Sequence, residues 1–394
     1  PFVSPLAYNL QNIPCDGLVH SLTAVFSDST DCTLTSQFTA PGTTCPHALI
    51  AGGGTICNNG SQQANIAVTF TVGAPPYTFV YAIDGISQPP VTHNSAAPYT
   101  ISTMTPGAYT LVSVANQSCP SGIVSGSATV IVNPLPTAAI SGTATVCRGA
   151  ASPGIAFTGG SATPPYTFTY NINGGSSQTV TTSSGNIANI QVPTDVAGTF
   201  TYNLVSVQDA STAMCSQLQT GSATVTVDPL PTATIAGTTT TCLDSPAPMI
   251  TFTGNGATPP YTFTYNLNGG TSQTVTTTSG NSIAVQAPTN VAGTFTYTLI
   301  SVQVAGATTC SQLQTGSATV TVNPLPVPAI TGPAAICVNA SGIYSTAGGM
   351  SGYSWTVSPG GTITGGGSTD SITVGWSTSG AKTITVNYTD ANGC

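Results

Sequence analysis

Two consecutive stretches of the chain, residues 134–228 and 229–323, have nearly the same sequence, so the chain repeats with a period of 95 residues. The segment Pro164–Tyr170, for example, recurs as Pro259–Tyr265. This period is that of a small domain and exceeds the unit of a solenoid, which is roughly 20 to 50 residues. Duplicating a domain adds length and valency, whereas an active site is needed only once. The repeat therefore favours a stalk or fibre.

Within each repeat, apolar and polar residues alternate along short segments. Threonines separate Tyr261, Phe263 and Tyr265, which places the aromatic side chains on one face of an extended strand and the hydroxyls on the other. Asn268-Gly269 follows this segment and fits a tight hairpin turn. With 43 Gly and 30 Pro and no helical period, we expect about seven short strands per repeat. We therefore predict an all-β chain, a tandem array of immunoglobulin-like β-sandwich domains.

Aligning the remaining sequence on the repeat predicts five parts. The first part, residues 1–45, carries the closing strands of a preceding domain. Three immunoglobulin-like repeats and a fourth domain follow, here named repeat 1, repeat 2, repeat 3 and the fourth domain; their ranges are 46–133, 134–228, 229–323 and 324–394.

The fourth domain differs from the repeats in two respects. Trp355 lies between Cys337 and Cys394, an order like the Cys…Trp…Cys of immunoglobulin sandwiches. The sequence also has no counterpart of Ser317–Val322, the last strand expected in repeat 3. Two explanations are open: either the sequence is a piece of a longer chain, or a partner donates the strand by β-strand addition.

Charge is almost absent from this chain and excludes several partners. Charged residues are 3% of the 394, against about a quarter in an ordinary globular protein. The two cations are Arg148 and Lys382, and all ten acidic residues are aspartates. Nucleic acid is therefore not expected as a partner, because it requires a basic patch. Membrane insertion is not expected either, since no apolar run approaches the ~18 residues of a membrane span.

Eleven cysteines occur, most of them at repeating positions, which indicates disulfides and an oxidising, extracellular compartment. We predict that each domain closes its own pair, because this register leaves no cysteine from Cys57 onward unpaired: Cys57–Cys119, Cys147–Cys215, Cys242–Cys310 and Cys337–Cys394. Closing a loop of about 68 residues stabilises a domain by roughly 4 kcal/mol in the chain-entropy model. The alternative register joins neighbouring domains through Cys119–Cys147, Cys215–Cys242 and Cys310–Cys337.

The three remaining cysteines, Cys15, Cys32 and Cys45, form an odd set. We expect Cys15–Cys45, with the partner of Cys32 in sequence upstream. Zinc binding is not expected, because no two cysteines have the Cys-x2–4-Cys spacing.

A Pro-Leu-Pro sequence leads from the last strand of one domain into the first strand of the next at Pro134-Leu135-Pro136, Pro229-Leu230-Pro231 and Pro324-Leu325-Pro326. Proline fixes φ and favours an extended backbone, so we predict short, stiff joints that hold the domains in line. The central leucine is expected to pack into the contact between domains. The alternative is a generic linker without such a role.

The sequence predicts no catalytic, cofactor-binding or metal-binding residue. No Gly-x-Ser-x-Gly elbow has a histidine and an acid around it, and the three histidines do not recur: His20, His47 and His93. The glycine triplet Gly52–Gly54 lacks the lysine of a phosphate loop and is predicted to be a turn. Calcium could bind Asp370 with Asp390, or Asp28 with Asp31, but no Asp-x-Asp pattern supports this.

Several segments resemble a known group of proteins. They are the Pro-Leu-Pro joints, the Pro-Pro-Tyr-Thr-Phe strands and, in the fourth domain, Tyr353–Val357, Gly360–Ile363 and Asp370–Val374. From Pro46 to Cys394 the chain resembles PKD-like and immunoglobulin-like repeats of very large surface proteins in Bacteroidota, including gliding-motility adhesins. The resemblance implies secretion, surface display and an adhesive or filamentous role, and it carries no catalytic residues.

These features together predict a non-enzymatic, disulfide-linked β-sandwich array that forms the shaft of a surface adhesin or extracellular filament. Its expected partners are neighbouring copies of the chain or surface glycans, which suit faces rich in Thr, Ser, Asn and Gln. Two alternatives are open: each repeat binds polysaccharide, or the array is an accessory region of a secreted hydrolase. Polysaccharide binding would require aromatic side chains on exposed faces, whereas the alternation places them inward.

Overall fold

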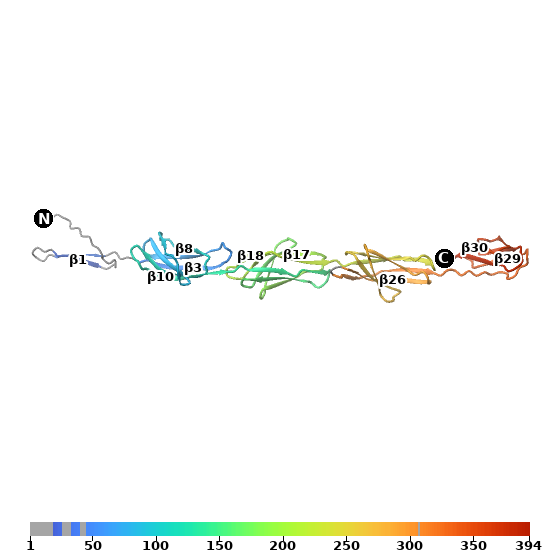
Figure 1. The fold of residues 1–394 in the computed structure, drawn as a ribbon, viewed down its shortest axis with the longest axis horizontal. Helices are drawn as coiled ribbons and strands as arrows, with labels where there is room; N and C mark the ends of the chain where they lie inside the picture. Colours follow the sequence, from blue (N-terminus) through green and yellow to red (C-terminus); the bar gives the residue numbers. More distant parts are fainter. Residues whose placement is uncertain (1–18, 26–32, 40–44, 306–307) are drawn as a thin grey trace. The chain divides into compact units, whose positions relative to one another are not determined.

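The structure is a computed structural model, and it describes residues 19–25, 33–39, 45–305 and 308–394. Every helix or strand in these residues is a β-strand, as the alternating pattern predicted (Figure 1). In the described ranges, no helix has the length and apolar character that a membrane span needs. The chain divides into two compact units. The first comprises Pro1–Gly142, Gly154–Gln191 and Thr201–Ala223, and the second Thr143–Pro153, Val192–Phe200 and Thr224–Cys394.

In the first unit, repeat 1 forms one continuous set of paired strands. Strand β3 (His47–Cys57) connects its two halves, because it pairs antiparallel with β4 (Ala64–Val72) and parallel with β10 (Ile123–Asn133). The remaining strands extend this set on both sides: β9 (Gly107–Asn116), β5 (Tyr77–Ile83), β6 (Ile86–Ser87), β7 (Val91–His93) and β8 (Tyr99–Thr103). Strands β1 (Val19–Val25) and β2 (Thr33–Thr39) pair with each other. Their assignment to a preceding domain stays a prediction.

Repeat 2 has strands in both units. In the first unit, β13 (Gly154–Gly160) pairs with β11 (Thr137–Ser141) and β16 (Ile187–Gln191). A second group contains β14 (Thr167–Ile172), β15 (Gln178–Thr181), β17 (Gly198–Gln208) and β18 (Ser216–Leu218). In the second unit, β12 (Ala144–Cys147) lies parallel to β19 (Ser222–Asp228).

Repeat 3 lies in the second unit and is a two-layer sandwich. One layer is a three-stranded sheet of β20 (Thr232–Ala236), β22 (Met249–Asn255) and β25 (Ser282–Gln286). The other runs in the order β21 (Thr239–Cys242), β28 (Ser317–Asn323), β26 (Gly293–Val304), β23 (Tyr261–Leu267) and β24 (Gln273–Thr276), with β27 (Ser311–Leu313) beside β26. This is the predicted immunoglobulin-like arrangement, with the first strand divided between the two sheets.

Aromatic side chains from both sheets meet in the core of repeat 3. The ring centroid of Phe252 lies 5.6 Å from that of Phe263 and 4.9 Å from that of Tyr265. Tyr261, Phe263 and Tyr265 are buried, whereas the threonines between them are partly exposed. The predicted alternation is confirmed. Such aromatic contacts contribute about 0.5–1.5 kcal/mol beyond the burial of their area.

A glycine allows the first strand to change sheets. In repeat 3, Gly237 lies between β20 and β21 with a φ of +119°, and a Cβ there would come within 2.4 Å of the Met249 carbonyl oxygen. A side chain is therefore disfavoured at this position. In repeat 1, β3 pairs with β10 on both sides of Gly52–Gly54 and with β4 only up to Gly52, and all three glycines have positive φ. The predicted turn is wrong here, because the residues on both sides of the triplet continue to pair.

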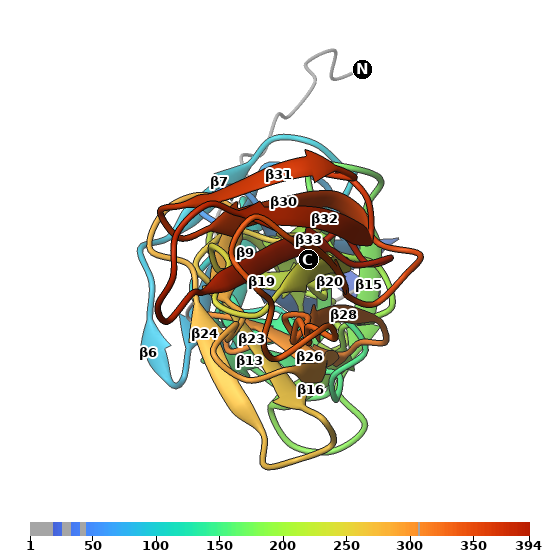
Figure 2. The same ribbon diagram turned by 90° about the vertical axis from the view of Figure 1, so that its right-hand side faces the viewer.

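The fourth domain is a smaller sandwich. One sheet contains β29 (Ser341–Ser345), β32 (Ser371–Trp376) and β31 (Gly361–Gly365), and the other contains β30 (Ser351–Val357) and β33 (Ile384–Thr389) (Figure 2). Its core is built from Trp355, Ile372, Val374 and Trp376. The indole Nε1–H of Trp355 donates a hydrogen bond to the Thr369 carbonyl at 2.9 Å, which satisfies its polar atom.

Burial raises the pKa of four tyrosines, Tyr81, Tyr170, Tyr202 and Tyr297. Folding therefore favours their neutral form. The resulting stabilisation is complete below the unfolded-state pKa of about 10 and is lost as pH rises through the raised values. We expect the phenolate of Tyr297 to form at a higher pH in the native protein than in the unfolded protein, measured as the absorbance that Tyr297→Phe removes. Removal of the same absorbance at the same pH in both states would contradict this.

Candidate functional site: disulfides between successive domains

Four disulfides form in the described part of the chain, and three join cysteines of successive domains. These three are Cys57–Cys215, Cys147–Cys310 and Cys242–Cys394, and the fourth is Cys45–Cys119. The four predicted pairs do not occur: Cys57–Cys119, Cys147–Cys215, Cys242–Cys310 and Cys337–Cys394. The alternative register does not occur either. Instead, the first cysteine of each repeat bonds the second cysteine of the next domain.

Two further expectations about cysteines are corrected. Cys337, the predicted partner of Cys394, is a free thiol among the described residues, and its side chain is exposed. The predicted Cys15–Cys45 pair is wrong, because Cys45 bonds Cys119. Cys15 and the other early cysteine lie outside the described residues.

The position of each cysteine in its sheet explains why a repeat does not close its own pair. In repeat 3, Cys242 lies beside Asn323, at the end of the sheet where β26 begins. Cys310 lies beyond Val304, at the end where β26 finishes. The 12 residues of β26 span roughly 40 Å at about 3.3 Å each. A disulfide requires Cα atoms about 4.4–6.8 Å apart, so Cys242 and Cys310 cannot bond.

The same strand arrangement carries each first cysteine to the joint with the next domain. Cys147 pairs in register with Asp228, the residue before the joint prolines, and bonds Cys310 of repeat 3 with Cα atoms 5.5 Å apart. Asp228 Oδ2 accepts a hydrogen bond from the Thr308 hydroxyl at 2.5 Å, and Cys147 packs against the core of repeat 3. A covalent bond, a charge-assisted hydrogen bond and an apolar contact therefore hold this joint.

An Asn or Asp side chain orders the loop of the second cysteine in three of the four domains. Its Oδ1 accepts the cysteine's backbone N–H at 2.8, 2.8 and 2.9 Å in the pairs Asn116–Cys119, Asp209–Cys215 and Asp390–Cys394. The N–H of Cys394 is the main cause that holds the pKa of Asp390 below its ordinary value. This support is present at neutral pH and is lost as pH falls through the lowered pKa. The sequence signal for this contact is an Asn or Asp three to six residues before the cysteine.

The proline joints differ from one another. At the joint between repeats 2 and 3, Pro231 is buried and Leu230 packs against the core of repeat 3. Pro136 is likewise buried at the preceding joint. Leu325, by contrast, is 48% exposed, so the expected leucine contact does not form there. The stiffness of the joints stays a prediction.

The structure describes two of the four aspartates that the sequence offers as calcium ligands, Asp370 and Asp390. Within the described ranges, no three His, Cys, Asp or Glu side chains gather in a group that could hold a metal ion. Asp370 and Asp390 therefore belong to no such group, and Asp28 and Asp31 lie outside those ranges. The imidazole of His93 is instead 2.8 Å from the carbonyl oxygen four residues on.

Comparison with known proteins supports the PKD-like character expected of the fourth domain. Residues 323–394 match the family model of the PKD-like domain, which confirms the resemblance of that part of the sequence. No curated protein matches the chain. Among solved structures, the chain is similar to a Ca²⁺-stabilised adhesin of an ice-binding Antarctic bacterium, with 18% identity over 88% of this chain and 89% of that one, and a TM-score of 0.38.

Two further solved structures are similar to this chain. One is a bacterial ice-binding adhesin, with 17% identity over 70% of this chain and 97% of that one, and a TM-score of 0.35. The other comprises four tandem repeats from the extending region of a large adhesion protein, with 16% identity over 88% and 89%, and a TM-score of 0.29.

Non-reducing peptide mapping is expected to recover Cys147–Cys310 and Cys242–Cys394. The protein should be unfolded and alkylated without reductant and then digested at acidic pH, where few thiolates remain to exchange disulfides. Among the cysteines from Cys45 onward, the alkylating reagent is expected to label Cys337 alone. Recovery of disulfides closed within single repeats would overturn the connectivity.

Proposed function

We propose that this chain is the structural repeat shaft of an extracellular surface adhesin or filament and has no catalytic role. The observation that carries this proposal is the connectivity of the four disulfides. Their loops overlap, so every residue from Cys45 to Cys394 lies inside at least one loop. Disulfides persist in oxidising compartments, which supports an extracellular location. An array linked in this way suits a part that must transmit tension between its ends.

A pulling force between Cys45 and Cys394 follows the shortest covalent path. That path runs 12 residues from Cys45 to Cys57, crosses to Cys215, runs 27 residues to Cys242 and crosses to Cys394. These 39 residues carry the tension in place of the 349 that separate the ends in sequence. The remaining chain, which includes most of the strands, bears no tension once this path is taut. The disulfides thus limit extension.

Polysaccharide binding by each repeat is less well supported. Carbohydrate sites present aromatic rings on accessible faces, whereas the aromatic residues of the recurring Pro-Pro-Tyr-Thr-Phe strands are buried. Tyr166, Phe168, Tyr261 and Phe263 are at most 1% exposed. The structure gives no specific support to the other alternative function, that of an accessory region of a secreted hydrolase.

The finer features of the proposal rest on the sequence. The Pro-Leu-Pro joints support stiff connections between domains that begin near residues 46, 134, 229 and 324. The resemblance to Bacteroidota surface proteins, including gliding-motility adhesins, supports display on a cell surface. Neighbouring copies and surface glycans are the proposed partners, because the exposed faces are rich in neutral hydroxyl and amide groups.

Electron microscopy of the oxidised and the reduced protein tests this function. Oxidised molecules are expected to show a narrow distribution of end-to-end distances, because each domain contact is fixed by a disulfide. Reduction followed by alkylation is expected to broaden the distribution while circular dichroism retains the β-sheet signal. Equally broad distributions in both states would reject the shaft.

A further inference from the structure

The outer face of one sheet of repeat 3 is nearly uniform in its chemistry. Sixteen residues of β21, β23, β24, β26, β27 and β28 lie beside one another across these strands, on the face away from the core, and none of them is buried. Thirteen carry a hydroxyl group, two carry a primary amide and one is a leucine. We name this set the hydroxyl face. Its members are Thr240, Thr262, Thr264, Asn266, Thr274, Thr276, Thr294, Thr296, Thr298, Ser301, Gln303, Ser311, Leu313, Ser317, Thr319 and Thr321.

The hydroxyl face is almost unchanged between repeats 2 and 3. Displaced by 95 residues, fifteen of its sixteen residues recur in repeat 2, and the exception is Asn203 in place of Thr298. The outer face of the other sheet is the internal comparison, because the same duplication produced both. Its ten residues lie on β20, β22 and β25: Thr232, Thr234, Ala236, Met249, Thr251, Thr253, Asn255, Ser282, Ala284 and Gln286. Three of these ten recur in repeat 2, namely Thr232, Thr253 and Gln286. The hydroxyl face is therefore retained selectively.

The formation of strands does not by itself explain this retention. On the other sheet, Met249 of repeat 3 is Gly154 in repeat 2, and Ser282 is Ile187. Outward positions of these strands thus accept side chains of very different size and polarity, as expected where packing does not decide the residue. An exposed polar surface that is kept while the opposite surface varies is typical of a binding surface.

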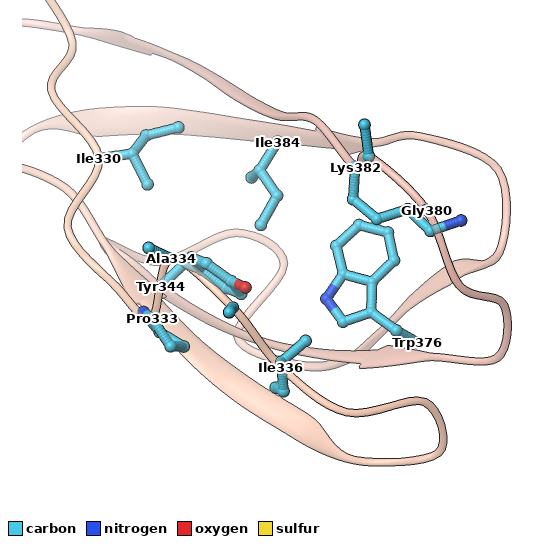
Figure 3. A pocket seen from close by; sticks show the side chains of 11 residues that line it. Ile330, Pro333, Ala334, Ile336, Tyr344, Trp376, Gly380, Lys382 and Ile384 are labelled. Atoms are coloured by element: carbon cyan, nitrogen blue, oxygen red, sulfur yellow. The ribbon is translucent and has the colours of Figure 1, made fainter.

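The composition of the hydroxyl face narrows the kind of partner. Its sixteen positions hold no charged and no aromatic residue in either repeat. It therefore lacks the groups that bind ions and nucleic acids and the rings that stack on sugars. It also differs from a concave site. In the fourth domain a groove of about 550 Å³ is lined by Ile336, Ile384 and Trp376 (Figure 3), whereas the hydroxyl face has Leu313 as its one large apolar side chain. The hydroxyl face suits another broad protein surface better than a small molecule.

The hydroxyl face is complementary to a second copy of itself. Hydroxyl and amide groups each carry both a donor and an acceptor, so like groups from two copies can hydrogen-bond to one another. Leu313 and its counterpart Leu218 are both 80% exposed and supply apolar area that such a contact would bury. Copies of a chain with a formal net charge of −8 repel one another. Because the hydroxyl face carries no charge, it is a surface through which two copies can approach with little repulsion.

The area of the hydroxyl face sets how many faces a stable contact needs. At about 4.8 Å between strands and about 6.6 Å between outward residues of one strand, a face of this size covers roughly 500 Å². A standard stable interface buries about 800 Å² of each partner. A single face is therefore too small for a stable dimer, whereas the faces of repeats 2 and 3 together, with roughly 1,000 Å², exceed that area.

We propose that the hydroxyl faces of repeats 2 and 3 bind the same faces on a second copy of the chain. This inference rests on the proposed function and names its partner, since it makes shafts associate side by side. Repeat 1 does not carry the face, because Val80 and Ala115 stand at the positions of Thr264 and Gln303. Since the two faces act together, the loss of either one weakens the association strongly.

Sedimentation velocity of the full oxidised chain measures the association, with Cys337 alkylated so that it cannot form disulfide dimers. The sedimentation coefficient is expected to rise with concentration. Leu218→Asp and Leu313→Asp each place a charge in the contact and are expected to weaken the association at least about tenfold. The matched controls are Ile187→Asp and Met249→Asp, at residues of the other sheets that are 52% and 47% exposed, and they are expected to leave it unchanged. A monomer at every concentration, or equal loss in all four variants, would reject the proposal.

Opposite charges on two batches of the chain identify the partner as a second copy. The double variants Leu218→Asp/Leu313→Asp and Leu218→Lys/Leu313→Lys are each expected to stay monomeric, because like charges meet in the contact. An equimolar mixture at low ionic strength is expected to associate at least about tenfold more strongly than either variant alone. A mixture that associates no more strongly than its components would overturn the assignment of the face to a second copy.

Immobilised dextran, a neutral polysaccharide, tests the other proposed partner. Dextran binding that Leu218→Asp/Leu313→Asp abolishes, in a chain that does not self-associate, would assign the face to glycans and reject the second copy. The shaft itself is tested separately, because the microscopy of oxidised and reduced protein follows individual molecules. A narrow distribution of end-to-end distances without self-association would therefore reject this inference and leave the proposed function standing.

Discussion

When the oxidised protein is stretched, the segment from Cys45 to Cys394 is expected to extend to only about a ninth of its length in the reduced protein. The shortest covalent path from Cys45 to Cys394 has 39 residues, against 349 in the reduced chain. At about 3.5 Å per residue these correspond to roughly 140 Å and 1,200 Å. Single-molecule force spectroscopy with and without reductant measures both.

Removal of one disulfide at a time gives the sharpest form of this experiment. In Cys57→Ser/Cys215→Ser the shortest path becomes 96 residues, made of 28 from Cys119 to Cys147 and 68 between Cys310 and Cys242. The extension limit is therefore expected to rise about two and a half times, to roughly 340 Å.

The matched control removes the next disulfide along the chain. In Cys147→Ser/Cys310→Ser the 39-residue path through the other disulfides is intact, so the limit is expected to stay at roughly 140 Å. Pairs closed within each domain would instead give the unmodified protein a path of 94 residues, or roughly 330 Å. That length in the unmodified protein would contradict the structure.

Truncation of a core aromatic side chain is expected to have the second largest effect. Phe263 is fully buried and contacts Phe252 and Tyr261, so Phe263→Ala should leave a cavity and destabilise repeat 3 by about 3–5 kcal/mol. Because a chain of several domains does not unfold in one step, hydrogen exchange in β23 and β26 is the appropriate measurement.

The repeated sequence supplies internal controls for this variant. Phe168 is the equivalent residue of repeat 2 and is also fully buried, so Phe168→Ala should lower protection there by a similar amount. Thr274→Ala alters an exposed residue of β24 and should change stability by less than about 0.5 kcal/mol. Protection lost equally in all three variants would show that the contacts in the core do not set the stability of each repeat.

The fold could be predicted from the sequence because its signals are local. The alternation from Tyr261 to Tyr265 fixes which side chains face inward, and such a pattern in several short segments needs two sheets to bury it. The divided first strand could not be predicted in this way. The triplet Gly52–Gly54 has the composition of a turn, and only the strands that pair on either side of it keep it extended.

The disulfides could not be assigned, because the sequence period is compatible with more than one register. Cys147 is 68 residues before Cys215 and 163 before Cys310, and these separations differ by one repeat of 95. The direction of β21 and β26, which places the two cysteines of a repeat at opposite ends of the sheet, excludes the shorter closure. That direction depends on sheet topology, for which the spacing of cysteines carries no signal.

The overlap of the disulfide loops also bears on how the protein survives damage. Any one peptide bond between Cys45 and Cys394 can be hydrolysed, and the two fragments remain attached through a bridge that spans the break. A single nick by a protease therefore does not shed whatever the far end carries. Release of that end requires either a reductant as well as a protease, or at least three cuts suitably placed.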